Sequence, residues 1–179
     1  MTVSDWAACV SDWREALKDL KEFIAPAFKR SEQRATAGMF IDGLLSGAER
    51  KTGWMLAEQA GLARPYQIQS LLGRSSWSAD TLCERVRSYA IEALGDPDGV
   101  LVVDETGFLK KGSHSVGVGR QYSGTAGRIE NCQIGVFASY ASRWGHALID
   151  RQLYLPKAWA NEPERRARAH VPEDVAFAT

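Results

Sequence analysis

Asp104 is the residue whose type and position best suit metal-dependent chemistry. It follows the apolar run at residues 100–103, has Glu105 beside it, and precedes a stretch without acidic residues at 106–129. A carboxylate at the end of a rigid strand would supply the oxygen ligand that Mg²⁺ prefers. A basic loop facing it would bring a phosphate to that ion. Judged by position alone, a polar turn residue that caps the end of a strand is the favoured interpretation.

The stretch without acidic residues is basic and rich in glycine. Its six glycines permit positive φ angles and close approach of the backbone to another group. Its basic side chains predict contacts with DNA phosphates, and each contact would add to a salt-dependent affinity. These candidate DNA-binding residues are Lys110, Lys111, His114, Arg120 and Arg128. Two solvent-exposed β-hairpins whose charges serve solubility would have the same composition, so both interpretations stay open.

A pair of short helices predicted over residues 54–73 offers a second set of DNA contacts. Its size and the turn at Gly61 match a helix-turn-helix. The polar side chains that it would present to DNA are Tyr66, Gln67, Gln69 and Arg74. A generic three-helix bundle predicts the same pattern equally well. Trp54 and Trp77 are expected to lie in the core rather than to stack on bases.

The bulk composition is that of an ordinary globular protein. The 179 residues include 22 basic and 22 acidic side chains, so any attraction to nucleic acid must be local. No apolar run of about 18 residues is present, which predicts no membrane association and a cytoplasmic location. Cys9, Cys83 and Cys132 lack the short spacing of a zinc or redox site and are expected to be small buried hydrophobes.

The elements that must position these residues divide into a helical half and a strand-rich half. Apolar residues three and four apart predict a helix over residues 6–24, whose stripe is expected to pack within its own domain rather than in a coiled coil. Further helices are predicted over residues 36–45, 54–61, 66–74 and 81–94. The first of these four should bury Phe40, Ile41, Leu44 and Leu45.

The turn cluster GDPDG at residues 95–99 is the predicted domain boundary. Beyond it, the apolar run at residues 100–103 is typical of a buried strand. The remaining predictions are strands over residues 115–122, 131–140 and 147–155, a short polar helix over 161–169, and the start of another strand at 175–179.

The long motif DETGFLKKGSHSVGVGRQYSGTAGRIENCQIGVF, followed by YAS, ALIDRQLYLP and FAT, resembles bacterial insertion-sequence transposases of the DDE superfamily. RKTGWMLAEQAG, RPYQIQSLLGRSSW and LGDPDGVLVVDETGF extend the resemblance to nearly the whole chain. It implies an α/β (α+β) fold with a DNA-binding helical bundle over residues 1–95. The first part of an RNase H-like catalytic domain with a mixed sheet would follow over residues 100–179.

In that family, two Asp and one Glu hold Mg²⁺ or Mn²⁺ for nicking and joining of DNA strands. Asp104 stands where the first of these acids stands, so the resemblance makes it the expected catalytic residue and metal ligand. No sequence here resembles the segments that carry the other two acids. The expectation is therefore an N-terminal fragment that holds the metal weakly and has negligible cleavage activity alone.

The partner implied by the resemblance is double-stranded DNA at transposon terminal repeats, with a homo-oligomer left open. An alternative function is a non-catalytic DNA-binding remnant, which would occupy transposon ends or pair with a full-length transposase. The two hypotheses differ in whether Asp104 and a divalent ion matter.

Overall fold

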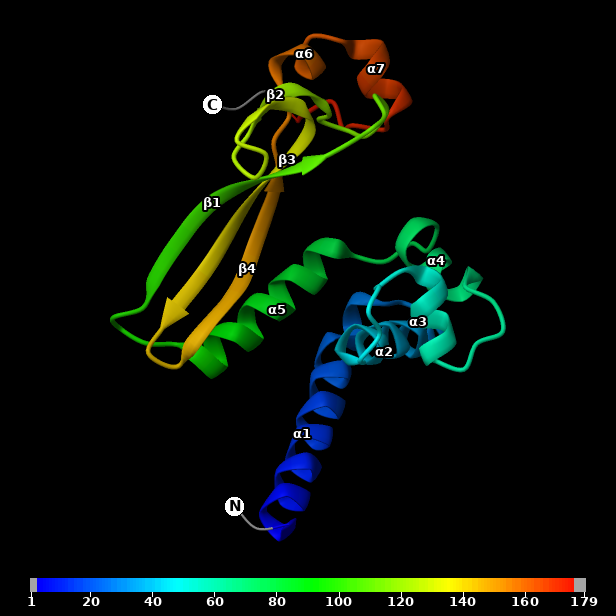
Figure 1. Cartoon of the computed structure of the whole chain (residues 1–179), viewed down its shortest axis with the longest axis vertical. Coiled ribbons are helices and arrows are strands. Elements are labelled where there is room, and N and C mark those ends of the chain that lie inside the picture. The colour runs from blue at the N-terminus through cyan, green and yellow to red at the C-terminus, as the bar shows by residue number, and fades with distance from the viewer. Residues whose placement is uncertain (1–2, 176–179) are drawn as a thin grey trace. The chain divides into compact units, whose positions relative to one another are not determined.

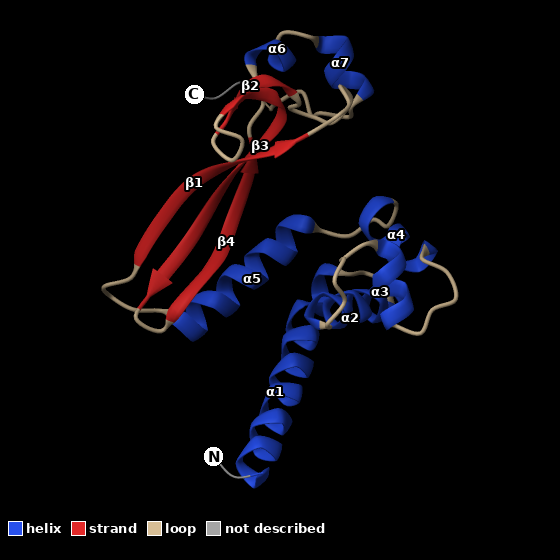
Figure 2. Ribbon diagram, viewed as in Figure 1, coloured by secondary structure: helices blue, strands red, loops and turns tan. Residues whose placement is uncertain are grey.

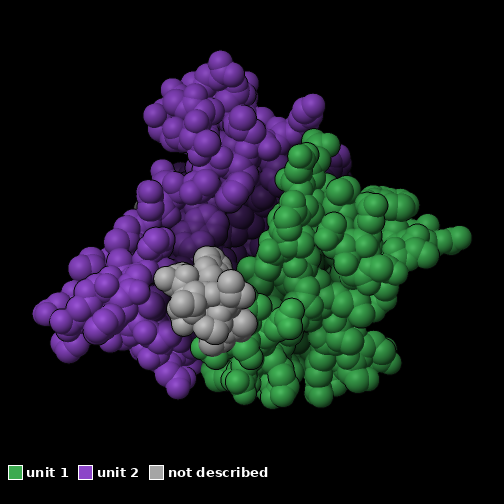
Figure 3. Space-filling view, turned by 60° about the horizontal axis from the view of Figure 1, so that its bottom comes forward, with its two compact units in different colours: residues 1–86 green, residues 87–179 purple. Residues whose placement is uncertain are grey.

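The computed structural model describes residues 3–175, which form two compact units (Figure 3). Unit 1 covers residues 1–86 and is helical, whereas unit 2 covers residues 87–179 and combines a sheet with helices (Figure 2). The division falls inside helix α5 (Ala79–Leu94), ahead of the turn cluster at residues 95–99. No helix in the described part of the chain is long and apolar enough to span a membrane.

Unit 1 contains the helices predicted from apolar spacing. Pro26 lies in a 3₁₀ turn (Ala25–Ala27) that ends α1. Thr52 caps the helix that begins at Gly53, and Ser78 caps the helix that begins at Ala79. Their hydroxyl groups accept hydrogen bonds from the backbone N–H of Met55 (3.4 Å) and Thr81 (3.1 Å), respectively. The helices are α1 (Val3–Ile24), α2 (Ser31–Leu45), α3 (Gly53–Gln59), α4 (Tyr66–Gly73) and the first part of α5.

The core of unit 1 consists of two small apolar clusters. One joins the end of α1 to α2 and α4 through Ile24, Ala37 and Leu71, and the other joins α3 to α4 through Leu56 and Ile68. Trp77 packs on the first cluster, with its ring centroid 5.4 Å from that of Phe28, and its indole N–H donates to the Leu71 carbonyl (2.8 Å). The expectation that Trp77 lies in the core is confirmed.

Several apolar side chains of unit 1 are more exposed than the sequence predicts. Trp13 is 75% exposed and Val10 is also exposed, because the N-terminal part of α1 extends beyond the other helices of the unit (Figure 1). Leu44 and Leu45, at the end of α2, are exposed as well. Trp54 is 64% exposed at the start of α3, so its predicted place in the core was wrong. Helical periodicity specifies which face is apolar but not how far along the helix that face is covered.

Unit 2 is built on a four-stranded antiparallel sheet in which β3 is central. Cys132 of β3 pairs with Leu109 of β1 on one side and with Gly119 of β2 on the other. Further along, β4 takes the place of β2 on the second side, from Gly135 to Ser142. The strands are β1 (Val100–Leu109), β2 (Gly119–Ser123), β3 (Arg128–Ser142) and β4 (Gly145–Leu153). The predicted α/β class is confirmed, with every described strand pair antiparallel.

The prediction for the apolar run at residues 100–103 was wrong in two respects. The four side chains are 49–61% exposed rather than buried, since β1 pairs on one edge only and its faces are largely uncovered within residues 3–175. The strand also continues to Leu109, because its ladder with β3 extends over all ten residues. Asp104 therefore lies within the strand and not at its end.

The connection from α5 to β1 is fixed by the Tyr140 hydroxyl of β3. This hydroxyl accepts from the Asp96 N–H (2.8 Å) and donates to the Asp96 carbonyl (3.0 Å). The Asp96 carboxylate is nearly buried and pairs with Arg143. A Cβ on Gly99 would lie only 2.0 Å from the same hydroxyl, so only glycine fits there. These contacts anchor the N-terminal end of β1.

Two short helices, α6 (Lys157–Ala160) and α7 (Pro163–Arg168), follow β4 and lie at the β2 end of the sheet (Figure 1). They enclose the third apolar cluster, formed by Val118, Leu155 and Trp159. α7 confirms the short polar helix predicted over residues 161–169, whereas α6 was not predicted. Residues 176–179, where most of another strand was predicted, lie outside the described residues.

Candidate functional site

Asp104 lies on one face of the sheet, in an open depression of 350 Å³. It pairs with Phe137 across the ladder, and the side chains alternate so that every second residue of β1 shares its face. The depression is lined by Val102, Asp104, Thr106, Phe108, Phe137, Ser139 and Leu148. Asp104 is the only charged residue among them. An exposed carboxylate in apolar surroundings is accessible to an ion from solvent.

One oxygen of Asp104 is left available for a ligand. Its Oδ1 accepts a hydrogen bond from the Glu105 N–H (2.8 Å), whereas Oδ2 has no hydrogen-bond donor among the described residues. Glu105 is paired with Val136, one position along the ladder, so its side chain belongs to the opposite face. The two adjacent carboxylates therefore do not converge on one ion.

Asp150 is also separated from Asp104 by the sheet. It pairs with Ala138 on the Glu105 side of the ladder. Its Oδ2 lies 2.7 Å from Arg87 Nη2, and its Oδ1 accepts from the Arg151 N–H (2.8 Å). This carboxylate ties β4 to the second half of α5 and has a structural partner, in contrast to Asp104.

The donor set fits a divalent metal ion only in part. Asp104 supplies one hard oxygen ligand of the kind that Mg²⁺ and Mn²⁺ prefer. Across residues 3–175, no three His, Cys, Asp or Glu side chains come close enough together to hold an ion. The assignment of Asp104 as a metal ligand stays a prediction.

The basic loop between β1 and β2 is held in place by two amide side chains of β3. Asn131 donates to the carbonyls of Lys110 (2.7 Å) and Gly112 (3.0 Å), and Gln133 donates to the carbonyl of Val116 (2.6 Å). The sequence signal was two amide side chains, Asn131 and Gln133, at alternate positions of a predicted strand and therefore on one face of it. Their role was not recognised from sequence.

The predicted DNA-binding residues are distributed over several elements. Lys111 and His114 are exposed on the loop, Arg120 is exposed on β2, and Lys110 directly follows β1. Arg128 begins β3, with its guanidinium 2.9 Å from the Glu130 carboxylate.

Gln67 and Arg74 belong to unit 1, whereas the basic loop belongs to unit 2. Gln67 donates its side-chain amide to the hydroxyl of the buried Thr36 (2.9 Å), which joins α4 to α2. Arg74 is exposed just after α4.

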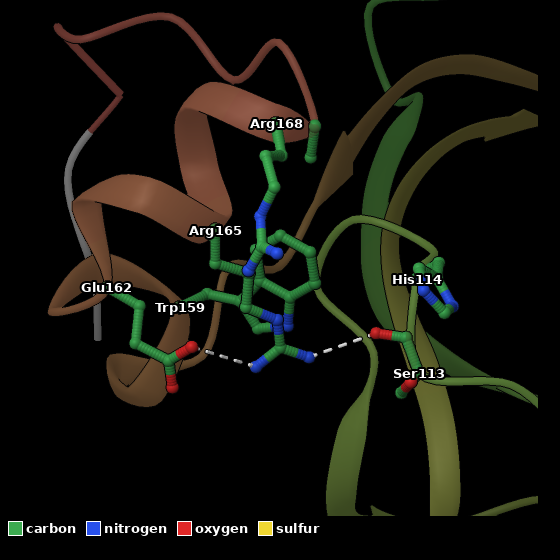
Figure 4. A pocket seen from close by; sticks show the side chains of 7 residues that line it. Ser113, His114, Trp159, Glu162, Arg165 and Arg168 are labelled. Atoms are coloured by element: carbon green, nitrogen blue, oxygen red, sulfur yellow. Dashed lines mark hydrogen bonds and ion pairs between the residues drawn. The ribbon is translucent and has the colours of Figure 1, made fainter.

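A pocket that the sequence did not suggest lies between the basic loop and the α6–α7 segment (Figure 4). It measures 620 Å³, and its charged side chains come mainly from α7. Trp159 forms its floor and is 1% exposed, with its indole N–H bonded to the Val118 carbonyl (2.7 Å). The sequence signal was the basic run PERRAR, which does not show that residues 113 and 114 lie beside it in the fold.

Comparison with known proteins gives one family. A family model described as DDE superfamily endonuclease matches residues 24–179. The chain belongs to this superfamily. The superfamily predicted from the sequence motifs is thereby confirmed, and its endonucleases generally use divalent metal ions.

One curated relative that matches part of this chain is named as an insertion-sequence transposase. The probable transposase for insertion sequence element IS701 of Microchaete diplosiphon is 33% identical over 89 residues. The match covers 50% of this chain and 23% of that protein, so the chain spans well under two thirds of the relative's length. No solved structure matches the chain.

Proposed function

We propose that this DDE superfamily chain acts in DNA transposition, as the part of an insertion-sequence transposase that carries the first metal-binding acid. The observation that supports this most directly is Asp104, which presents a free carboxylate oxygen on an open face of β1. A bound Mg²⁺ or Mn²⁺ would polarise the phosphate and activate the attacking oxygen. The role of Asp104 is to hold that ion on the rigid ladder of β1 and β3.

The DNA contacts in this proposal come from both units. Residues 1–95 would form a DNA-binding domain, with Gln67 and Arg74 among its contacts. Residues 100–179 would form the first part of an RNase H-like domain, whose basic loop neutralises phosphates of the same DNA. Because Asn131 and Gln133 fix the loop backbone, its charged side chains start from a defined position.

A second candidate function is DNA binding without catalysis. It is favoured by one observation, that Asp104 is the single carboxylate of its depression. In this case the chain would occupy insertion-sequence ends or pair with a complete transposase, and the divalent ion would be irrelevant.

Binding of terminal-repeat DNA with and without Mn²⁺ distinguishes the two functions. Fluorescence anisotropy titrations would compare the wild-type chain with Asp104→Asn and with Glu105→Gln, which removes the neighbouring carboxylate on the opposite face. We expect Mn²⁺ to tighten binding of wild type and Glu105→Gln, since the ion would link a carboxylate to a phosphate. Asp104→Asn should lose that gain and keep its metal-free affinity.

The other outcomes have clear meanings. Equal affinity with and without Mn²⁺ in all three proteins would support non-catalytic DNA binding. Failure of the wild-type chain to prefer terminal-repeat DNA over a scrambled duplex would contradict both functions.

A further inference from the structure

We propose that the pocket between the basic loop and α7 binds a phosphate of the DNA backbone, with Arg168 and His114 as the contacting residues. This inference rests on the proposed function, because it adds Arg168 of α7, which no sequence motif indicated, to the DNA contacts of the basic loop. Three features carry it: the concave shape, the arrangement of the arginines of α7, and the position of the loop.

The pocket is preformed by buried contacts. Trp159 is held by its bond to the Val118 carbonyl, and the Arg165 guanidinium stacks 3.9 Å from the centre of its ring. Arg165 also donates to the carbonyl of Ser113 (3.1 Å), so α7 and the basic loop are joined across the pocket. Because the site is already ordered, binding of a ligand does not have to pay the conformational entropy of ordering it.

The arginines of α7 have different roles. Arg165 is occupied by Trp159, Ser113 and the Glu162 carboxylate (3.5 Å). Arg166 donates to the carbonyls of Pro172 (2.7 Å) and Val175 (2.6 Å), which fixes the segment after α7. Arg168 makes no hydrogen bond or ion pair with any described residue, yet it reaches into the pocket toward Arg165 (Figure 4).

The charges of the pocket favour an anion. Arg165 and Arg168 supply two positive charges against the single carboxylate of Glu162. Two neighbouring guanidinium groups repel each other, and an anion between Arg168 and the loop would relieve that repulsion. The arginine fork matches the oxygens of a phosphate, with which it forms paired hydrogen bonds.

The pocket is also continuous with the basic loop. His114 lines it, and Lys110 and Lys111 precede His114 in the same loop, within the stretch that contains no acidic residue. A DNA strand that follows the loop would meet Lys111, His114 and Arg168 in turn. A backbone phosphate is therefore a better ligand for this site than an isolated small anion.

The salt dependence of DNA affinity tests this assignment. Anisotropy titrations with a duplex, from about 50 to 200 mM NaCl, give a slope whose magnitude falls by about 0.9 for each phosphate that the protein no longer neutralises. We expect Arg168→Gln to lower the slope by about one such step, and His114→Gln to weaken binding with a smaller change in slope. Lys157→Gln is the matched control, because it removes the same charge from an exposed position of α6 that does not line the pocket.

A second arm uses inorganic phosphate to distinguish a DNA phosphate from a free one. Weak displacement of DNA by inorganic phosphate, abolished in Arg168→Gln, supports the proposal. Saturation of the pocket by micromolar inorganic phosphate, with DNA affinity unchanged in Arg168→Gln, would show a free-anion site and overturn it.

The inference can fail separately from the proposed function. If wild type binds DNA and Arg168→Gln matches Lys157→Gln in affinity and slope, the pocket assignment is wrong and DNA binding stands. If wild type does not bind DNA, both are wrong.

Discussion

Replacing Trp159 tests whether the α6–α7 segment holds the basic loop. Trp159 is 1% exposed and packs with Val118 and Leu155, so Trp159→Ala removes a fully buried indole. Substitutions of this kind cost about 3–5 kcal/mol. Trp159→Phe retains most of the apolar volume but loses the hydrogen bond to the Val118 carbonyl. Leaving a buried acceptor without a donor lowers stability by about 1–3 kcal/mol. Arg165 also reaches that carbonyl (3.4 Å), which places the expected loss for Trp159→Phe at the lower end of that range.

Hydrogen exchange measured by mass spectrometry suits this test, since it reports the opening free energy of residues 110–123 separately from unit 1. The expected order of opening free energy is wild type, then Trp159→Phe, then Trp159→Ala. Trp144→Ala is the control, because Trp144 is exposed and its stacking with Arg143 contributes at most about 1 kcal/mol. An effect of Trp159→Ala no larger than that of Trp144→Ala would refute the idea that the indole anchors the loop.

Two further predictions concern close packing and thiols. Gly107→Ala should lower the free energy of unfolding by about 1–3 kcal/mol, because its Cβ would lie 2.4 Å from the hydroxyl oxygen of the buried Ser123. Thermal unfolding checks this, with Gly112→Ala, which meets nothing within 4 Å, as the control. Cys9 should react rapidly with a thiol reagent whereas Cys132 should react only on unfolding, since Cys9 is exposed and burial, aided by Glu130, raises the pKa of Cys132. Because the Cys132 thiol ionises at a lower pH in the unfolded chain than in the folded chain, the free energy of unfolding should fall as pH rises through the ordinary thiol range. Cys132→Ser should remove that fall. Equal labelling of Cys9 and Cys132 in the folded protein would contradict the prediction.

The sequence predicts much of the architecture because local signals are strong here. Apolar spacing places the helices, and GDPDG places the connection between α5 and β1. The glycine-rich segment predicts hairpin turns, and Gly117 and Gly127 do adopt positive φ angles of 76° and 66°. These features depend on residues close together in the chain.

Features that depend on distant residues were not predictable in the same way. Exposure of Trp13, of Trp54 and of the apolar run in β1 depends on which elements cover them, and Cys9 is exposed for the same reason. The pocket joins residues 113–114 to residues 159–169, which are brought together by Trp159 and by the stacking of Arg165. Periodicity within one segment carries no information about such pairs.

The central claim is that Asp104 is a metal-ligating acid, and the most direct measurement is paramagnetic line broadening by Mn²⁺ in NMR spectra of the ¹⁵N-labelled chain. Broadening detects weak binding, so it suits an ion held by a single carboxylate. We predict that substoichiometric Mn²⁺ broadens the amide signals around Asp104 and its cross-strand partner Phe137. This effect should persist in Glu105→Gln and vanish in Asp104→Asn. Broadening that is absent from this face in wild type, or equal in wild type and Asp104→Asn, would contradict the claim.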